Sequence, residues 1–272
     1  IGLQYKRVEP FYNTLTTDYF YNDIENITAN FSTATRKGDF RLSGNIGFEH
    51  NNLYNHQSVT SKRVIGSVNG TFMPITTLVL GIRYSNYTQN SESGLVVIND
   101  TLRLATTSAN IGLTANYTLG KAKNQSVSVY AGKTDIIDNS PVERLADLKM
   151  GMVTASYSWS LKEINFRISP SVNYNKYQYP DSRQERFGGG LTLSKALMDK
   201  QINLSLGSNY SRNDIDEYQN GYSISSRIGI SYTPYKSGTF NFSLQHISNQ
   251  TIIEDAFSEI RGRIQYTQKF GL

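Results

Sequence analysis

The sequence predicts an all-β protein whose strands cross a membrane as an antiparallel up-and-down β-barrel, and three observations lead to this prediction. The chain has 272 residues, of which 38% are hydrophobic, 18% charged and 12% aromatic. Apolar and polar residues alternate along most of it, which is the period of a strand with two different faces. The alternating segments are about 10 to 15 residues long, whereas a sandwich strand has about 5 or 6 and a tilted membrane strand needs about 9 to 11.

The composition excludes several other classes of protein. The longest strictly apolar run, Leu95–Ile98, is far shorter than the roughly 18 residues of a spanning helix. The aromatic content is too high for an intrinsically disordered chain. The sequence has no cysteine, which removes disulfides, thiolate metal sites and cysteine nucleophiles. A soluble β-sandwich is the alternative that alternation alone would allow, and the strand lengths argue against it.

The segment that begins at Phe40 shows the two expected faces. Its apolar positions are Phe40, Leu42, Ile46 and Phe48, and its polar positions are Arg41, Ser43, Asn45 and Glu49. Segments that begin near residues 164, 202, 222 and 260 repeat this scheme. The polar set is rich in Ser, Asn, Gly and Arg, which suits a wet lumen, while the apolar set suits lipid.

Turn signals separate these segments and alternate between short and long connections. Short turns are expected near 36–39, 73–74, 120–124, 161–163, 198–200 and 235–238, and long loops near 9–21, 53–61, 89–101, 134–146, 178–184, 212–220 and 249–255. The alternation predicts about fourteen strands, with a range of about twelve to sixteen. Pro170 lies within one segment and predicts a bulge or bend, with a strand boundary as the alternative.

An even number of strands places both termini on the side of the short turns. In bacterial outer-membrane barrels that side is the periplasm, and the longer loops are extracellular. Acidic residues gather in the expected long loops and lysines in the short turns. We therefore expect residues 1–272 to form one transmembrane domain with both termini in the periplasm, either alone or as the barrel of a longer polypeptide.

Aromatic residues on the apolar face gather towards the segment ends, as expected of girdles at the two bilayer interfaces. The girdle near the short turns is predicted to contain Phe72, Tyr117, Trp159, Tyr232 and Phe270. The girdle near the long loops is predicted to contain Phe48, Tyr84, Tyr174, Tyr210 and Tyr222.

Arginine side chains are expected to line the lumen. By alternation the polar face carries Arg41, Arg63, Arg83, Arg167, Arg186, Arg227, Arg261 and Arg263. Arginine around a constriction favours anions. A barrel of about fourteen strands lies between small barrels filled by side chains and wide aqueous channels. The sequence therefore leaves two alternatives open: an anion-favouring channel, or a lumen plugged by arginine hydrogen bonds to Asn, Ser and Tyr.

Catalytic patterns are weak. His246 is expected on the lipid-facing side near the outer end of a strand, with Ser248 on the same strand and Ser258 on the next. A barrel phospholipase would need such a pair, because histidine serves as base for a serine nucleophile. An interfacial histidine is the simpler interpretation, and no spacing marks a protease. We expect no enzyme, no cofactor, no metal site and, because the basic residues form no single patch, no nucleic-acid partner.

The alternating strands and girdles resemble bacterial outer-membrane β-barrel proteins over the whole chain. The opening segments, Tyr5–Pro10 and Asp18–Ile27, are similar to the openings of barrels from Bacteroidota. This resemblance implies a Gram-negative origin and carries no functional residues. Such barrels often end on an aromatic residue, whereas here Gly271 and Leu272 follow Phe270. A chain that opens inside a strand at Ile1 is expected to be a mature or partial chain.

Two functions remain. The first, placed ahead because channels are common among such barrels, is a porin-like channel for small polar or anionic solutes. The second is a non-conducting structural or accessory barrel, either a subunit of a secretion or barrel-assembly complex or a membrane anchor for an attached domain. The Tyr- and Asn-rich loops resemble adaptable contact surfaces. Expected partners are the lipid bilayer, lipopolysaccharide and other outer-membrane proteins.

Overall fold

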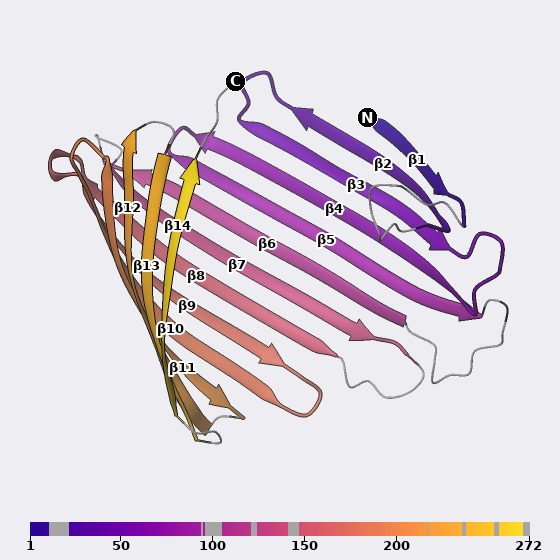
Figure 1. Cartoon of the computed structure of the whole chain (residues 1–272). Helices are drawn as coiled ribbons and strands as arrows, with labels where there is room; N and C mark the ends of the chain where they lie inside the picture. Colours follow the sequence, from indigo (N-terminus) through magenta and orange to yellow (C-terminus); the bar gives the residue numbers. More distant parts are fainter. Residues whose placement is uncertain are drawn as a thin grey trace. The chain divides into compact units, whose positions relative to one another are not determined.

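A computed structural model describes residues 1–10, 22–93, 95, 105–120, 124–140, 147–216, 218–235, 238–252 and 256–268. Its 14 strands follow one another in chain order, each beside its neighbour in sequence, as Figure 1 shows. The strands are β1 (Gly2–Val8), β2 (Ile24–Ala34), β3 (Phe40–Asn51), β4 (Val59–Ile75), β5 (Leu78–Ser93), β6 (Ala105–Leu119), β7 (Gln125–Asp138), β8 (Leu148–Leu161), β9 (Phe166–Gln178), β10 (Arg183–Leu197), β11 (Ile202–Ile215), β12 (Tyr218–Tyr235), β13 (Gly238–Thr251) and β14 (Phe257–Gln268). The predicted all-β class and strand number are confirmed.

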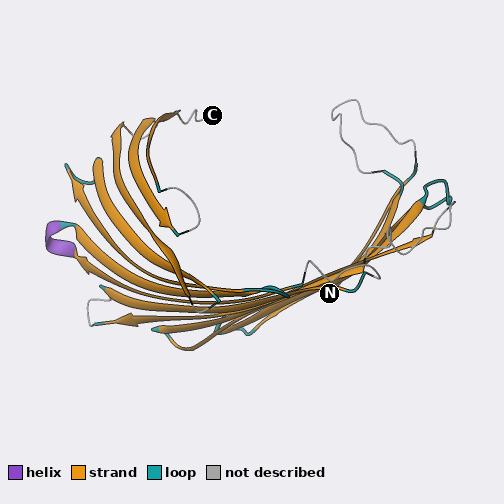
Figure 2. Cartoon of the chain, turned by 90° about the horizontal axis from the view of Figure 1, so that it is seen from below, coloured by secondary structure: helices purple, strands orange, loops and turns teal. Residues whose placement is uncertain are grey.

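Helical structure in the described ranges is limited to the short 3-10 turn η2 (Lys162–Ile164) between β8 and β9, drawn purple in Figure 2. None of the helical structure described is long and apolar enough to span a membrane.

The chain divides into two compact units. Unit 1 consists of Ile1–Thr114, Ala131–Gly151 and Tyr177–Asp181, and unit 2 of Ala115–Tyr130, Met152–Lys176 and Ser182–Leu272. Within unit 1 the strands from β1 through β5 pair antiparallel, each with the next in sequence. Within unit 2 the strands from β10 through β14 pair antiparallel in the same way.

The register of each ladder separates an apolar face from a polar face. In unit 1, Phe48 lies opposite Val64 on one face, and Glu49 lies opposite Arg63 on the other. In unit 2, Leu206 lies opposite Ile228 on the apolar face. Directly opposed residues share a face because side chains alternate along every strand.

In the part of the chain that the structure describes, the apolar face of each unit is left largely uncovered. Leu206 is 49% exposed, and among the described residues only Val8 and Ile24 are buried apolar side chains. A water-soluble domain buries most of its large apolar side chains in a core and exposes no continuous apolar surface of this kind. The arrangement is that of a sheet whose apolar face meets lipid.

Proline residues mark two irregularities in the ladders. The register shifts between Phe72 and Ile75, around Pro74, and between Tyr232 and Tyr235, around Pro234. Proline has no N–H to give to a ladder, so it is tolerated where pairing is interrupted. Strand β9 runs without a break through Pro170, so the alternative of a strand boundary there is wrong; the bulge stays a prediction.

Several connections are shorter than the sequence predicts, because the strands extend further. The expected turn at 73–74 lies inside β4, and the expected loop at 212–220 narrows to the connection between β11 and β12. Asp216, at this connection, adopts a left-handed φ of 49°. The strand ends carry polar residues on both faces, so alternation stops before the strand does.

Replacing Gly221 by Ala is expected to destabilise the protein by about 1–3 kcal/mol, the usual cost of a strained backbone position. Gly221 has a φ of 153°, and a Cβ there would lie 1.9 Å from the carbonyl oxygen of Gln250. The matched control is Gly207→Ala, where the nearest atom, Thr192 Oγ1, is 3.6 Å away. Urea unfolding in lipid vesicles measures both variants. Equal stabilities would contradict the close approach of β13 to Gly221.

Candidate functional site

The polar face of unit 2 carries arginines held by neutral partners. Arg186 Nη2 donates hydrogen bonds to Ser211 Oγ at 2.8 Å and Ser223 Oγ at 3.4 Å. Arg227 Nη2 donates to Gln245 Oε1 at 3.5 Å. Because hydroxyl and amide partners carry no charge, they do not offset the positive charge of these guanidinium groups.

Arg167, on β9, donates from Nε to Ser160 Oγ of β8 at 3.0 Å. On β14, Arg261 instead pairs with Glu259, with Nη2 to Oε2 at 2.7 Å. Arg263 lies opposite Ser243 of β13.

The polar face of unit 1 holds the remaining three predicted arginines. Arg63 Nη1 lies 2.9 Å from Glu49 Oε1, and both side chains are about one-fifth exposed. Arg83 Nε donates to Asn69 Oδ1 at 3.2 Å. Arg41 lies opposite Thr71 in the ladder.

The predicted arginines therefore occupy one face in each unit, and their charge is only partly balanced. Glu49 and Glu259 are the acids found paired with these arginines among the described residues. The sequence could predict the face but not the partners, because most of these come from other strands, Glu259 on the same strand as Arg261 being the exception. That the arginines of both units line one lumen stays a prediction.

Most of the aromatic residues predicted as girdles lie on exposed surface. Those with large exposed fractions are Phe48, Phe72, Tyr84, Tyr117, Trp159, Tyr174, Tyr210 and Tyr232. Tyr210 and Tyr222 stack with ring centroids 6.1 Å apart. A further pair outside the predicted set, Phe240 and Tyr266, lies 4.5 Å apart at the short-turn end of β13 and β14. Phe270 falls outside the residues that the structure describes, and the assignment to lipid interfaces stays a prediction.

Charged residues replace apolar ones where each apolar band ends. In unit 1, Lys62 lies on the same face as Val64, two residues nearer the start of β4, and its Nζ lies 2.6 Å from Glu92 Oε2. In unit 2, Arg212 follows Tyr210, and its Nε lies 2.8 Å from Asp214 Oδ1. These ion pairs give each apolar band a charged boundary towards the longer connections. The sequence does not predict these ion pairs, because Glu92 and Asp214 lie in segments expected to be loops.

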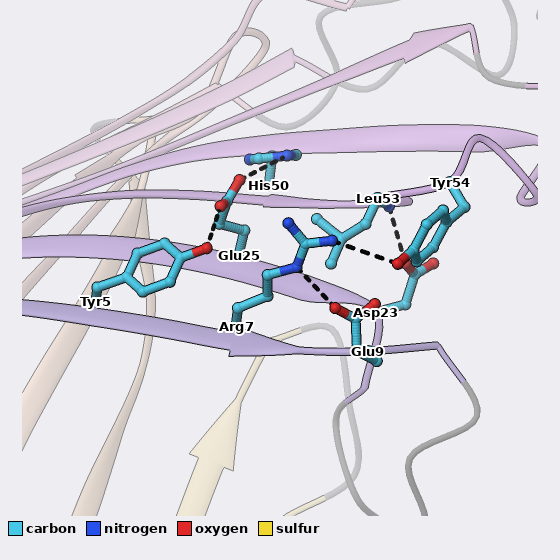
Figure 3. Close-up of polar contacts among 8 residues, drawn as sticks. All are labelled: Tyr5, Arg7, Glu9, Asp23, Glu25, His50, Leu53 and Tyr54. Atoms are coloured by element: carbon cyan, nitrogen blue, oxygen red, sulfur yellow. Dashed lines mark hydrogen bonds and ion pairs between the residues drawn. The ribbon is translucent and has the colours of Figure 1, made fainter.

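A cluster of polar contacts forms the same boundary on β1 to β3, as Figure 3 shows. Glu25 accepts a hydrogen bond from the Tyr5 hydroxyl at 2.6 Å and lies 3.5 Å from His50 Nε2. Tyr5 is opposite Ile27, and Ile27 is opposite Phe48, so these polar groups belong to the apolar face beyond its last apolar residues.

Glu9 lies just after β1 in the same cluster. Its carboxylate is 2.9 Å from Arg7 Nε, and Arg7 Nη2 donates to the Tyr54 hydroxyl at 3.5 Å. The hydrogen bond from Tyr54 lowers the pKa of Glu9 below its usual range, and the Arg7 guanidinium adds a smaller effect in the same direction. The carboxylate therefore stays ionised at neutral pH, and the contact is lost only when the pH falls through that lowered pKa.

No family model and no curated protein matches the chain. Solved structures do match. The alcaligin outer membrane receptor FauA from Bordetella pertussis superposes with a TM-score of 0.65 at 12% identity, covering 89% of this chain and 46% of the receptor. The ferric preacinetobactin receptor BauA from Acinetobacter baumannii gives a TM-score of 0.68 at 7% identity, covering 91% and 50%.

The fold is that of an outer-membrane β-barrel. This chain spans about half the length of the two receptors. At identities of 12% and 7% the likeness concerns the fold alone.

The apolar face of the barrel chain carries one candidate catalytic pair. His246 Nε2 lies 2.8 Å from Ser258 Oγ. The register places both on the face of Leu244 and Ile260, as the alternation predicts. A Ser–His hydrolase also needs a group that orients the second imidazole nitrogen. No described side chain hydrogen-bonds Nδ1 of His246, and the described residues contain no cluster of ligands for a metal ion.

We expect the purified protein to leave phospholipid and p-nitrophenyl esters intact, because the described residues give this pair no orienting partner. Ser258→Ala is the matched variant, and a fatty-acid release assay on mixed micelles measures both proteins. Ester hydrolysis by the native chain that Ser258→Ala abolishes would contradict the expectation and make the pair catalytic.

Proposed function

We propose that this chain is an outer-membrane porin-like channel for small polar or anionic solutes. The observation that carries the proposal is the polar face, where Arg186, Arg227 and Arg167 are held by Ser and Gln side chains. Hydrogen bonds fix the guanidinium groups without neutralising them, so a water-filled lumen lined by this face would attract anions. Arginine suits this role because it remains protonated at all accessible pH values.

The apolar face and its charged boundary support a place for the chain in the bilayer. We propose that the short turns and both termini face the periplasm, with residues 1–272 as one transmembrane domain, alone or within a longer polypeptide. The boundary cations, such as Lys62 and Arg212, then lie near the headgroups of the outer leaflet, where lipopolysaccharide is the expected partner.

The second candidate function is a non-conducting accessory barrel, a subunit of a secretion or barrel-assembly complex or an anchor for an attached domain. The same hydrogen bonds favour it, because arginines tied across strands, such as Arg63 to Glu49, also suit a lumen filled by side chains. The two candidates differ in one property, which is whether solutes pass.

Proteoliposome swelling distinguishes them. We expect a sugar acid to enter faster than a neutral sugar of the same size, and an amino sugar to enter slowest, because the polar face is cationic. The folded state of the inserted protein is checked by its heat-dependent mobility on gels. Absence of swelling with every solute, in liposomes that hold folded protein, would reject the channel and leave the accessory barrel.

A further inference from the structure

A cavity of about 440 Å³ lies at the short-turn end of unit 2. Three chain segments enclose it: the approach to β7 at Asn124, the β8–β9 connection that contains η2, and the β10–β11 connection. Its volume falls within the range of about 300–1,000 Å³ that is usual for small-molecule sites.

Backbone hydrogen bonds hold these segments together. Ser160 N donates to Asn124 O at 2.8 Å, and Ala196 N donates to Asn165 O at 3.0 Å. Asn165 and Lys200 have left-handed φ values of 50° and 71°, which make the two connections tight. The walls of the cavity are therefore strand ends and tight turns rather than long loops.

The cavity combines positive charge with hydrogen-bond donors. Lys162, Arg167, Lys195 and Lys200 line it, and no aspartate or glutamate is among its described lining residues. Glu163 and Asp199 neighbour Lys162 and Lys200 in sequence without contributing to the lining.

Arg167 is already oriented for a ligand. Its Nε donates to Ser160 Oγ at 3.0 Å, which fixes the plane of the guanidinium. The described residues give its Nη groups no acceptor, so they can form paired hydrogen bonds to two oxygens of one anion. Asn203, Ser160 and Asn124 supply further polar groups around it.

We propose that this cavity binds a small soluble oxyanion carrying phosphate groups, such as a diphosphate. Four basic lining residues match a ligand with more than one anionic group, and the volume limits it to a small molecule. Asn203 lines the cavity and lies on the polar face, whereas its neighbour Leu204 lies on the apolar face. The cavity is therefore expected to open on the polar side and to take its ligand from water rather than from the bilayer. The site depends on the local fold of unit 2 and not on an open lumen.

The test is isothermal titration of inorganic pyrophosphate into the full chain, folded in an uncharged detergent. We expect saturable binding that Arg167→Gln and Lys200→Gln each weaken by roughly tenfold, the loss of one charge-assisted contact. Lys200 lies in a turn, so its variant tests the site even if Arg167→Gln disturbs folding. The control is Arg212→Gln, which removes the same charge from the apolar face, and we expect its affinity to match that of the native chain.

Absence of saturable pyrophosphate binding to the folded native chain would overturn the site. An equal loss in Arg212→Gln would also overturn it, because binding would then follow overall charge. Pyrophosphate binding by a protein that passes no solute would reject the channel and support the site. Conductance without pyrophosphate binding would support the channel and reject the site.

Discussion

Replacing Arg227 by Glu is expected to weaken the anion preference of the proposed channel strongly. Arg227 lies in the middle of β12, opposite Gly207 on one side and Gln245 on the other. A unit charge about 8 Å from an ion in water contributes ~0.5 kcal/mol, so a change of two charges alters anion partitioning by about fivefold. Salt screens this effect, and reversal potentials should therefore be measured at low ionic strength.

Arg212→Glu is the matched control for this substitution. It makes the same change of charge in β11, but on the apolar face, where Arg212 pairs with Asp214. We expect the reversal potential of this variant to equal that of the native chain. A shift as large as that of Arg227→Glu would show that selectivity does not come from the polar face, and an unchanged Arg227→Glu potential would remove that arginine from the lumen.

Replacing Leu206 by Arg is expected to lower the free energy of unfolding in a bilayer by about 2–4 kcal/mol, the cost of a cation near the membrane midplane. Leu206 is 49% exposed and lies opposite Leu193 and Ile228 on the apolar face. Lipid rather than protein must surround it if this face meets the membrane core. Denaturant titration of protein folded into phospholipid vesicles measures the change.

Ser205→Arg provides the comparison, because Ser205 precedes Leu206 in β11 and lies on the polar face opposite Gly229. We expect this variant to change stability by less than about 1 kcal/mol, because substitutions on water-exposed surface usually have small effects. Equal destabilisation by the two substitutions would contradict the assignment of lipid to one face and water to the other.

The sequence could predict the strand number and the two faces because both depend on a local period. In β3 the even positions from Phe40 to Phe48 form the apolar face and the odd positions from Arg41 to Glu49 form the polar face. The register of the ladder keeps each face continuous with the same face of the next strand. The prediction failed where the period ends. Beyond Tyr210, β11 continues through Arg212 and Asp214 with polar residues on both faces, which resembles a loop in sequence.

The candidate sites depend on partners that sequence spacing does not reveal. Arg167 could be placed on the polar face, but its contact with Ser160 requires β8 and β9 to lie side by side. The cavity also needs Lys162 and Lys200, two turn lysines separated by all of β9 and β10. Alternation assigns a residue to a face, whereas the register and the turns decide which residues meet.

Single-channel recording of the native protein in a planar bilayer, under a salt gradient, shows whether the chain forms an anion-selective channel. We expect discrete conductance steps and a reversal potential of the sign that anion selectivity gives, because Arg167, Arg186 and Arg227 on the polar face are held by neutral side chains. A folded, inserted protein that never conducts would contradict the channel, and steps with cation selectivity would contradict the role of the arginines.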